Sequence, residues 1–238
     1  MKLWTSGNML IYGLQKLTLL DYPGETAATV FLNGCDFRCP YCHNSHLLSG
    51  DCEPLMDEEE LFSFLDRRKG LLDAVVVSGG EPCLNRGLKD LICGIKDRGF
   101  KVKLDTNGNH PEELKSLIEQ GLLDYVAMDI KNSLPKYGLT IGIQDIDTTG
   151  IRESVSLLLQ GKCDYEFRTT VVKGLHELED FTLIGKWIEG AKRYFLQQFV
   201  QRDSVPDRDL QSPDKEELDT YLREVRKYVP NAELRGLS

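Results

Sequence analysis

Short apolar runs alternate with amphipathic stretches along most of this 238-residue chain. Several runs are rich in β-branched residues and four to eight residues long, which is typical of strands buried on both faces of a parallel sheet. The pattern predicts six strands: 27–33, 72–77, 100–104, 124–130, 165–172 and 194–200. A looser alternation over 11–20, broken by the turn signal Asp21–Gly24, predicts a short hairpin or an extended lead-in.

Helical patterns follow the predicted strands, and their ends carry recognisable signals. Asp57 with Glu60 three residues later predicts a capped helix start, and Asn85 is expected to cap the next helix, which ends at Gly99. Pro111 predicts the first turn of a helix that closes at Gly121. Further helices are expected over 151–160, over 179–190 and from 212–213 onward.

A strand and a helix therefore alternate about six times with short connections, which predicts a single α/β domain with a parallel sheet. We assign it to residues 27–238, preceded by a short N-terminal extension over 1–26. Six such units fit an open doubly wound sheet or an incomplete barrel, and periodicity does not separate the two. In both, chemistry gathers at the carboxyl ends of the strands.

Composition narrows the class of protein. The chain is 41% hydrophobic and 28% charged, with a formal net charge of −9, as in a globular protein with a sizeable core. The excess of acidic residues argues against binding nucleic acid or an anionic membrane surface. No apolar run approaches the roughly 20 residues that span a bilayer. The N-terminus shows no secretion signal, so a cytoplasmic protein is expected.

Three of the seven cysteines fall within eight residues, as Cys35, Cys39 and Cys42, directly after the first predicted strand. A disulfide framework is not expected in a cytosolic protein. Three thiolates can hold one metal centre and leave a fourth position open, as a working site does. The others are interpreted as small buried residues: Cys52, Cys83, Cys93 and Cys163.

Polar, charged or glycine residues close nearly every predicted strand, on what should be one rim. They are Ser78–Pro82, Asp105–Gly108, Met128–Lys131, Glu166–Thr170 and Gln197–Arg202. Any single one has a simpler interpretation: Gly79-Gly80 as a tight turn, Asp105 as a helix cap, Asp129 and Lys131 as a weak surface pair. Arg168, inside an apolar strand, needs an anionic partner from the protein or from a ligand.

Four kinds of site are compatible with the cysteine motif. Cys39-Pro-Tyr-Cys42 matches a dithiol redox motif, and with His43 it matches a haem attachment motif. A zinc site would take His43 or Cys52 as its fourth ligand. An iron–sulfur cluster with one unligated iron uses all three cysteines and also accounts for the glycines and charges of the rim.

The spacing C-x3-C-x-aromatic-C followed by Gly79-Gly-Glu-Pro82 resembles the signature of radical S-adenosylmethionine enzymes. Within that superfamily the chain resembles glycyl-radical-enzyme activases over about residues 10–200. It is most similar to activators of anaerobic ribonucleoside-triphosphate reductase, then to pyruvate formate-lyase activase. The segments that carry this likeness are Gly13–Gly24, Tyr41–Asn44, Asp105–Gly108 and Met128–Lys131.

This resemblance implies a partial (β/α)6 barrel of the TIM type, one 4Fe-4S cluster on Cys35, Cys39 and Cys42, and S-adenosylmethionine on the open iron. Reductive cleavage of that cofactor would yield methionine and a 5′-deoxyadenosyl radical, which abstracts hydrogen from a glycine of the partner enzyme. The protein orients and shields the cofactor, so no catalytic acid, base or nucleophile is expected. The residues that the family motifs assign to the cofactor are Tyr41, His43, Gly79, Gly80, Glu81, Asp105, Thr106, Asp129, Lys131 and Arg168.

More detailed roles also follow from the resemblance alone. Tyr41 would lie near the adenine, and the carbonyls of Gly79 and Gly80 would receive the amino group of the methionine moiety. Arg168 would balance the carboxylate of that moiety, while Asp129 and Lys131 would contact ribose and carboxylate. Asp105, Thr106, Met128 and Asp129 match a group that holds a monovalent cation in pyruvate formate-lyase activase.

Two departures from related activases matter. No eight-cysteine ferredoxin-like segment separates Cys42 from Gly79, so one cluster is expected, and the electron would come from a flavodoxin or ferredoxin. No histidine of the lyase activase type occurs near Gln198–Arg202. The expected function is activation of a glycyl radical enzyme, and the expected partner is the anaerobic ribonucleoside-triphosphate reductase. The alternatives are another glycyl radical partner, a small-molecule substrate, or a zinc or thiol-redox module.

Overall fold

The computed structural model describes residues 9–48 and 52–236, which form two compact units interleaved along the chain. The first unit takes residues up to 36, then 46–106 and 112–126. The second takes 37–45, 107–111 and 127 onward. The three clustered cysteines divide between the units, Cys35 in the first and Cys39 and Cys42 in the second.

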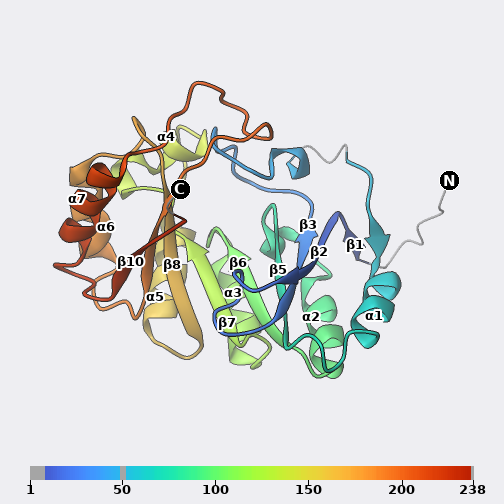
Figure 1. Ribbon diagram of the computed structural model, residues 1–238. Coiled ribbons are helices and arrows are strands. Elements are labelled where there is room, and N and C mark those ends of the chain that lie inside the picture. The colour runs from blue at the N-terminus through green and yellow to red at the C-terminus, as the bar shows by residue number, and fades with distance from the viewer. Residues whose placement is uncertain (1–8, 49–51, 237–238) are drawn as a thin grey trace. The chain divides into compact units, whose positions relative to one another are not determined.

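Parallel strands form the centre of the first unit (Figure 1). β3, β5 and β6 pair in parallel, as expected for nearly continuous apolar runs. β2 pairs antiparallel with β3 and ends the sheet, so of the two predicted alternatives the segment forms the hairpin and not an extended lead-in. The strands of this unit are β1 (Leu10–Ile11), β2 (Gly13–Thr18), β3 (Ala27–Leu32), β4 (Met56–Asp57), β5 (Ala74–Gly79) and β6 (Lys101–Thr106).

Helices α1 (Glu58–Asp66) and α2 (Leu88–Asp97) bury their apolar faces in this unit, and α3 (Pro111–Glu119) starts at the predicted proline. Asp57 and Glu60 form the predicted reciprocal capping box at the start of α1. The prediction for Asn85 was wrong. Gly87 occupies the N-cap position of α2. The side-chain amide of Asn85 instead donates to backbone carbonyls, among them that of Asn33. Asn85 follows a single 3-10 turn (Pro82–Leu84), which intervenes between strand and helix.

The second unit continues the alternation. β7 (Tyr125–Asp129) begins in the first unit and ends in the second, and β8 (Asp164–Val171) pairs in parallel with β9 (Tyr194–Gln198). Helices α6 and α7 lie side by side (Figure 1), with the rings of Phe181 and Tyr221 stacked 4.5 Å apart. The helices are α4 (Tyr137–Ile141), α5 (Thr149–Leu159), α6 (Leu178–Trp187) and α7 (Lys215–Val225), with further 3-10 turns at Ser45–Leu47 and Leu134–Lys136.

A further strand, β10 (Ala232–Arg235), pairs in parallel with β9 and was not predicted. Its four residues, Ala-Glu-Leu-Arg, carry no run of β-branched residues, so the sequence signal is weak. Tertiary contacts hold it instead: Nη1 of Arg235 lies 2.8 Å from the fully buried carboxylate of Glu166, and the guanidinium lies 3.6 Å from the ring centroid of Phe195. The predicted α/β class with a mostly parallel sheet is confirmed. Within the described residues, no helix is long and apolar enough to cross a membrane.

Candidate functional site

The glycine pair after β5 is required by close packing of two strand ends. Gly79 has φ of +125°, and a Cβ on it would lie 2.2 Å from the carbonyl oxygen of Leu32. A Cβ on Gly80 would lie 2.0 Å from the carbonyl oxygen of Gly34 and 3.3 Å from Cβ of Cys35. The amides of Gly80 and Glu81 donate to the carbonyls of Leu32 and Gly34. The pair therefore does more than make a turn, because it lets the end of β5 lie directly against the segment that enters the cysteine motif.

Glu81 points into the protein. It is fully buried, and its Oε1 accepts hydrogen bonds from the amide of Cys83 at 3.0 Å and from Oγ1 of Thr106 at 2.8 Å. These bonds satisfy a buried carboxylate and tie the end of β5 to the end of β6. Burial, together with the charge of Glu81, raises the pKa of the Cys83 thiol well above its usual range. Cys83 is thus a neutral buried residue, as the sequence indicated. The same interpretation was wrong for Cys52, Cys93 and Cys163, which are only half-buried.

Asp105 has a partner that the sequence analysis missed. Lys103, two residues earlier on β6, is 1% exposed, and its ammonium contacts Oδ1 of Asp105. Oγ of Ser78 donates to Oδ2 at 3.3 Å. Asp105 lies within β6 and is not a helix cap. The alternation of side chains along a strand was the available signal, because it places positions 103 and 105 on one face.

Cys39 and Cys42 lie on one turn of the second unit, closed by a hydrogen bond from the amide of Cys42 to the carbonyl of Cys39 at 3.2 Å. Cys39 is buried and Cys42 half-buried. Burial raises the pKa of Cys39 to about 11 against the opposing influence of Lys131, and burial also raises the pKa of Cys42. Both are therefore thiols at neutral pH, and a metal bound there would displace their protons.

Tyr41, between these cysteines, is also buried. Within the described part of the chain its hydroxyl has no hydrogen-bond partner. Burial raises the pKa of the phenol well above its usual range, so the ring stays neutral. Its predicted place beside the adenine remains a prediction.

Asp129, at the end of β7, joins two cations. Nε of Arg168 and Nζ of Lys131 each lie 2.9 Å from one of its carboxylate oxygens. Burial opposes ionisation of Asp129, but the charges of Arg168 and Lys131 outweigh it and lower the pKa to about 2. The anionic partner that Arg168 required in its apolar strand is thus supplied by the protein.

Two residues that the sequence analysis did not single out fix this segment. The amide of Lys131 donates to the hydroxyl of Tyr137 at 3.3 Å, and the carbonyl of Lys131 lies 2.9 Å from Nε2 of His176. The amide of Val172 donates to Nδ1 of His176, so the proton is on Nε2 and is donated to Lys131. The backbone that carries Asp129 and Lys131 is therefore held from both sides.

His43 turns toward the chain after β9. Its Nε2 lies 2.8 Å from the carbonyl oxygen of Val200, and its ring stacks on Phe199 with an interplanar angle of 6°. These contacts orient the motif loop, and they occupy one of the two ring nitrogens through which His43 could bind zinc.

Three cysteines can hold three irons of an iron–sulfur cluster and leave the fourth iron open, whereas a closed zinc site needs a fourth protein ligand. Cys35, Cys39 and Cys42 form no disulfide, and thiolates are the usual ligands of such clusters. Over 9–48 and 52–236, no three His, Cys, Asp or Glu side chains surround a single metal position. The cluster ligands thus rest on the motif and the thiol chemistry, and Cys35, Cys39 and Cys42 are the residues that would hold it.

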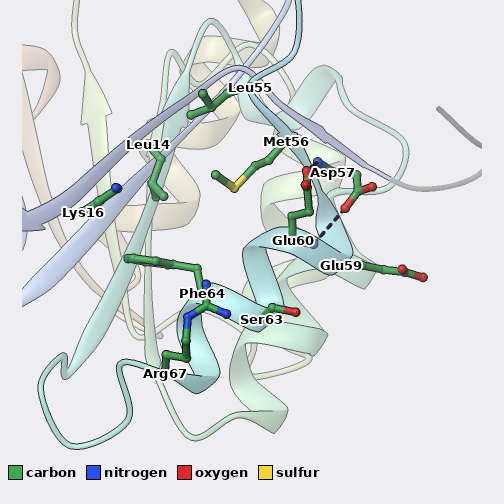
Figure 2. Close-up of a pocket in the computed structure, with 10 residues that line it drawn as sticks. All are labelled: Leu14, Lys16, Leu55, Met56, Asp57, Glu59, Glu60, Ser63, Phe64 and Arg67. Carbon is green, nitrogen blue, oxygen red and sulfur yellow. Dashed lines mark hydrogen bonds between the residues drawn. The ribbon is translucent and has the colours of Figure 1, made fainter. Parts of the chain in front are cut away.

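A separate concavity in the first unit contains none of the predicted site residues (Figure 2). It has a volume of about 710 Å³ and lies between β2, β4 and α1, with Met56 and Phe64 among its apolar lining. Lys16 and Arg67 contribute positive charge, and Asp57, Glu59 and Glu60 negative charge. Lys16 stands on the edge strand β2, where a charged residue discourages pairing with another strand.

Comparison with known proteins identifies the family. Residues 29–178, well over half of the chain, match the radical SAM superfamily model. The "Putative glycyl-radical enzyme activating enzyme MJ1227" of Methanocaldococcus jannaschii is 34% identical over 96% of this chain and 97% of its own length. The pyruvate formate-lyase-activating enzyme of Clostridium pasteurianum is 27% identical over 90% of this chain and 97% of its own length.

Solved structures share the fold at low sequence identity. Streptococcus suis SuiB bound to S-adenosylmethionine has a TM-score of 0.66 at 14% identity and covers 86% of this chain and 48% of its own. QueE from Escherichia coli has a TM-score of 0.55 at 16% identity, and the match covers 97% of this chain and 95% of QueE. These likenesses support the predicted partial-barrel class. The chain belongs to the radical SAM superfamily, among the glycyl-radical-enzyme activating enzymes, a family that uses a 4Fe-4S cluster and S-adenosylmethionine.

Proposed function

We propose that this enzyme generates the glycyl radical of an anaerobic ribonucleoside-triphosphate reductase. The observation that carries the activase assignment is the 34% identity to a glycyl-radical-enzyme activating relative along nearly the whole of both chains. The narrower choice of partner rests on the motif segments Gly13–Gly24, Asp105–Gly108 and Met128–Lys131, which resemble activators of that reductase.

Within this function, Cys35, Cys39 and Cys42 hold the cluster, and the bound cluster supplies the electron that splits S-adenosylmethionine. Tyr41, Gly79 and Gly80 bind the adenine and the methionine amino group. Arg168, Lys131 and Asp129 form a fixed charged group that receives the carboxylate and ribose. His43, Glu81 and Thr106 act through the backbone that they fix, since their polar atoms contact the protein itself.

The chain carries one cysteine motif of this kind, so the reducing electron must come from outside, and we take a flavodoxin or a ferredoxin as its donor. We also place the enzyme in the cytoplasm, because its seven cysteines form no disulfide in the structure and a reducing compartment keeps cysteines in that state.

One experiment tests both the chemistry and the partner. The reconstituted, reduced enzyme is mixed anaerobically with S-adenosylmethionine and either the reductase or pyruvate formate-lyase, and the electron paramagnetic resonance spectrum is recorded. A glycyl doublet with the reductase and none with the lyase is the expected result. A doublet with the lyase alone would reassign the partner, and no cleavage of the cofactor with either would refute the proposed chemistry.

A second candidate is radical chemistry on a small molecule. It is favoured by the 7-carboxy-7-deazaguanine synthase of Methanopyrus kandleri, which is 30% identical over 66% of this chain and 71% of its own length. Cofactor cleavage that is accelerated by a small substrate and yields no protein radical would favour this candidate.

A further inference from the structure

Lys103 is the most deeply buried charge of β6. Its side chain is 1% exposed, and in the sheet it pairs with Val76, a member of the apolar cluster formed with Tyr22, Ala27, Ala74 and Tyr125. An ammonium group in such surroundings is retained only if a carboxylate compensates it. That carboxylate is Asp105, two residues along the same face of the strand.

The carboxylate of Asp105 is engaged at both oxygens. Oδ1 contacts the ammonium of Lys103, and Oδ2 accepts the hydroxyl of Ser78 at 3.3 Å. The neighbouring hydroxyl, that of Thr106, is buried and donates to Glu81 at 2.8 Å. Two of the oxygen groups that the family resemblance offers to a monovalent cation are thus already committed within the first unit.

A metal cation does not fit this arrangement. Hard cations are held by several oxygen ligands at once, and here a positive charge already lies against the carboxylate that would attract one. In the second unit Asp129 is likewise paired, with Lys131 and Arg168. The protein's own side chains therefore supply the positive charge that a bound ion would bring.

We propose that Lys103 is a built-in counter-cation of the cofactor site, so that Asp105 binds no sodium or potassium ion and cofactor binding requires none. Lys103 acts as a positioning residue, because it holds the Asp105 carboxylate at the end of β6. The inference rests on the proposed function and on the family resemblance behind it, which places Asp105 beside the cofactor. The absence of an ion at Asp105 can be measured independently of that function.

The first measurement uses thallium(I) as a spectroscopic substitute for potassium. The cluster-loaded protein is titrated with thallium(I) acetate in choline acetate, and saturable binding is followed by ²⁰⁵Tl NMR. We expect none for the wild type and one bound ion for Lys103→Met, which keeps the length of the side chain but removes its charge. The added substitution Asp105→Asn should abolish that binding. Saturable binding by the wild type that Asp105→Asn removes would overturn the proposal, as would a folded Lys103→Met protein that binds no ion.

The second measurement is the dissociation constant of S-adenosylmethionine in choline chloride and in potassium chloride at equal ionic strength. For the wild type, the dissociation constants in the two salts should differ by less than about twofold. Lys103→Met should bind S-adenosylmethionine about tenfold more weakly in choline chloride and recover its affinity in potassium chloride, as expected for an uncompensated carboxylate charge. Lys101→Met is the matched control, since it removes the same charge from the same strand at a side chain 54% exposed. Like the wild type, Lys101→Met should bind S-adenosylmethionine about equally well in both salts.

The outcomes separate the two proposals. A wild-type protein that fails to bind S-adenosylmethionine refutes the proposed function, yet its thallium titration still tests the role of Lys103. If Lys103→Met does not fold, the thallium titrations of the wild type and of Asp105→Asn still test whether Asp105 binds an ion. Potassium-dependent cofactor binding by the wild type contradicts the proposal.

Discussion

Nε of Arg168 on β8 lies 2.9 Å from Oδ1 of Asp129 on β7, while Nζ of Lys131 takes the other oxygen of the same carboxylate. Side-chain exposure of 13% for Arg168 and 31% for Asp129 shows that this is not a fully solvated surface pair. The sequence indicated that Arg168 needs an anionic partner and that Asp129 and Lys131 form a weak surface pair. In the structure these three side chains form one charged group.

Arg168→Met should lower both stability and cofactor binding. The substitution leaves a half-buried carboxylate with one partner instead of two, so we expect a loss of about 2 kcal/mol in the free energy of unfolding. Urea denaturation measures it. Lys192→Met is the control, because the Lys192–Asp164 pair is 53% and 61% exposed and its removal should change little. Equal effects of the two substitutions would contradict the structural role given to Arg168.

Substitution of a cluster ligand should remove the metal without unfolding the chain. Cys39→Ala should fail to reach the roughly four iron and four sulfide per chain that one such cluster contains. Cys163→Ala, a cysteine outside the motif whose Sγ lies 3.4 Å from the carbonyl oxygen of Asp164, should load normally. Iron and sulfide analysis after anaerobic reconstitution decides, and a Cys39→Ala protein with the full cluster would rule out the ligand assignment.

Gly80→Ala should be far more damaging than an ordinary glycine substitution. The new methyl group would lie 2.0 Å from the carbonyl oxygen of Gly34, so the ends of β3 and β5 must separate, with an expected cost of about 3 kcal/mol or more. Gly99→Ala is the comparison, since its Cβ meets nothing within 4 Å and only the φ of +88° costs about 1 kcal/mol. Thermal unfolding of the two variants should preserve this order.

Stability should fall below neutral pH because His176 is buried in its neutral form. Burial lowers its pKa from 6.5 in the folded protein, although its hydrogen bonds to Lys131 and Val172 oppose the shift. As the pH falls below about 6.5, the unfolded chain therefore binds more protons than the folded protein. The free energy of unfolding should decrease, by at most about 1.4 kcal/mol per pH unit for this one group.

The comparison is between His176→Gln and His46→Gln, since His46 is exposed. Urea denaturation between pH 5 and 7.5 should show a shallower slope for His176→Gln and an unchanged slope for His46→Gln. A slope that does not depend on His176 would show that another group titrates.

Local patterns predicted most of the elements, because periodicity and end signals act over a few residues. The capping box of Asp57 and Glu60, the proline start of α3 and the glycine ends of α2 and α3 follow from such signals. Asn85 misled because a cap residue also suits a 3-10 turn, which is where the chain uses it. β10 escaped notice because its position depends on Glu166, 69 residues away along the chain.

The cysteine spacing and the glycine motif were enough to indicate the chemistry and the family, since a cluster and its cofactor demand particular atoms at short intervals along the chain. The partners of the charged residues depend on the tertiary structure. Lys103 and Ser78 meet Asp105, Arg168 meets Asp129, and His176 meets Lys131. Most of these pairs join different strands and loops, so their energies depend on distances and burial that exist only after folding.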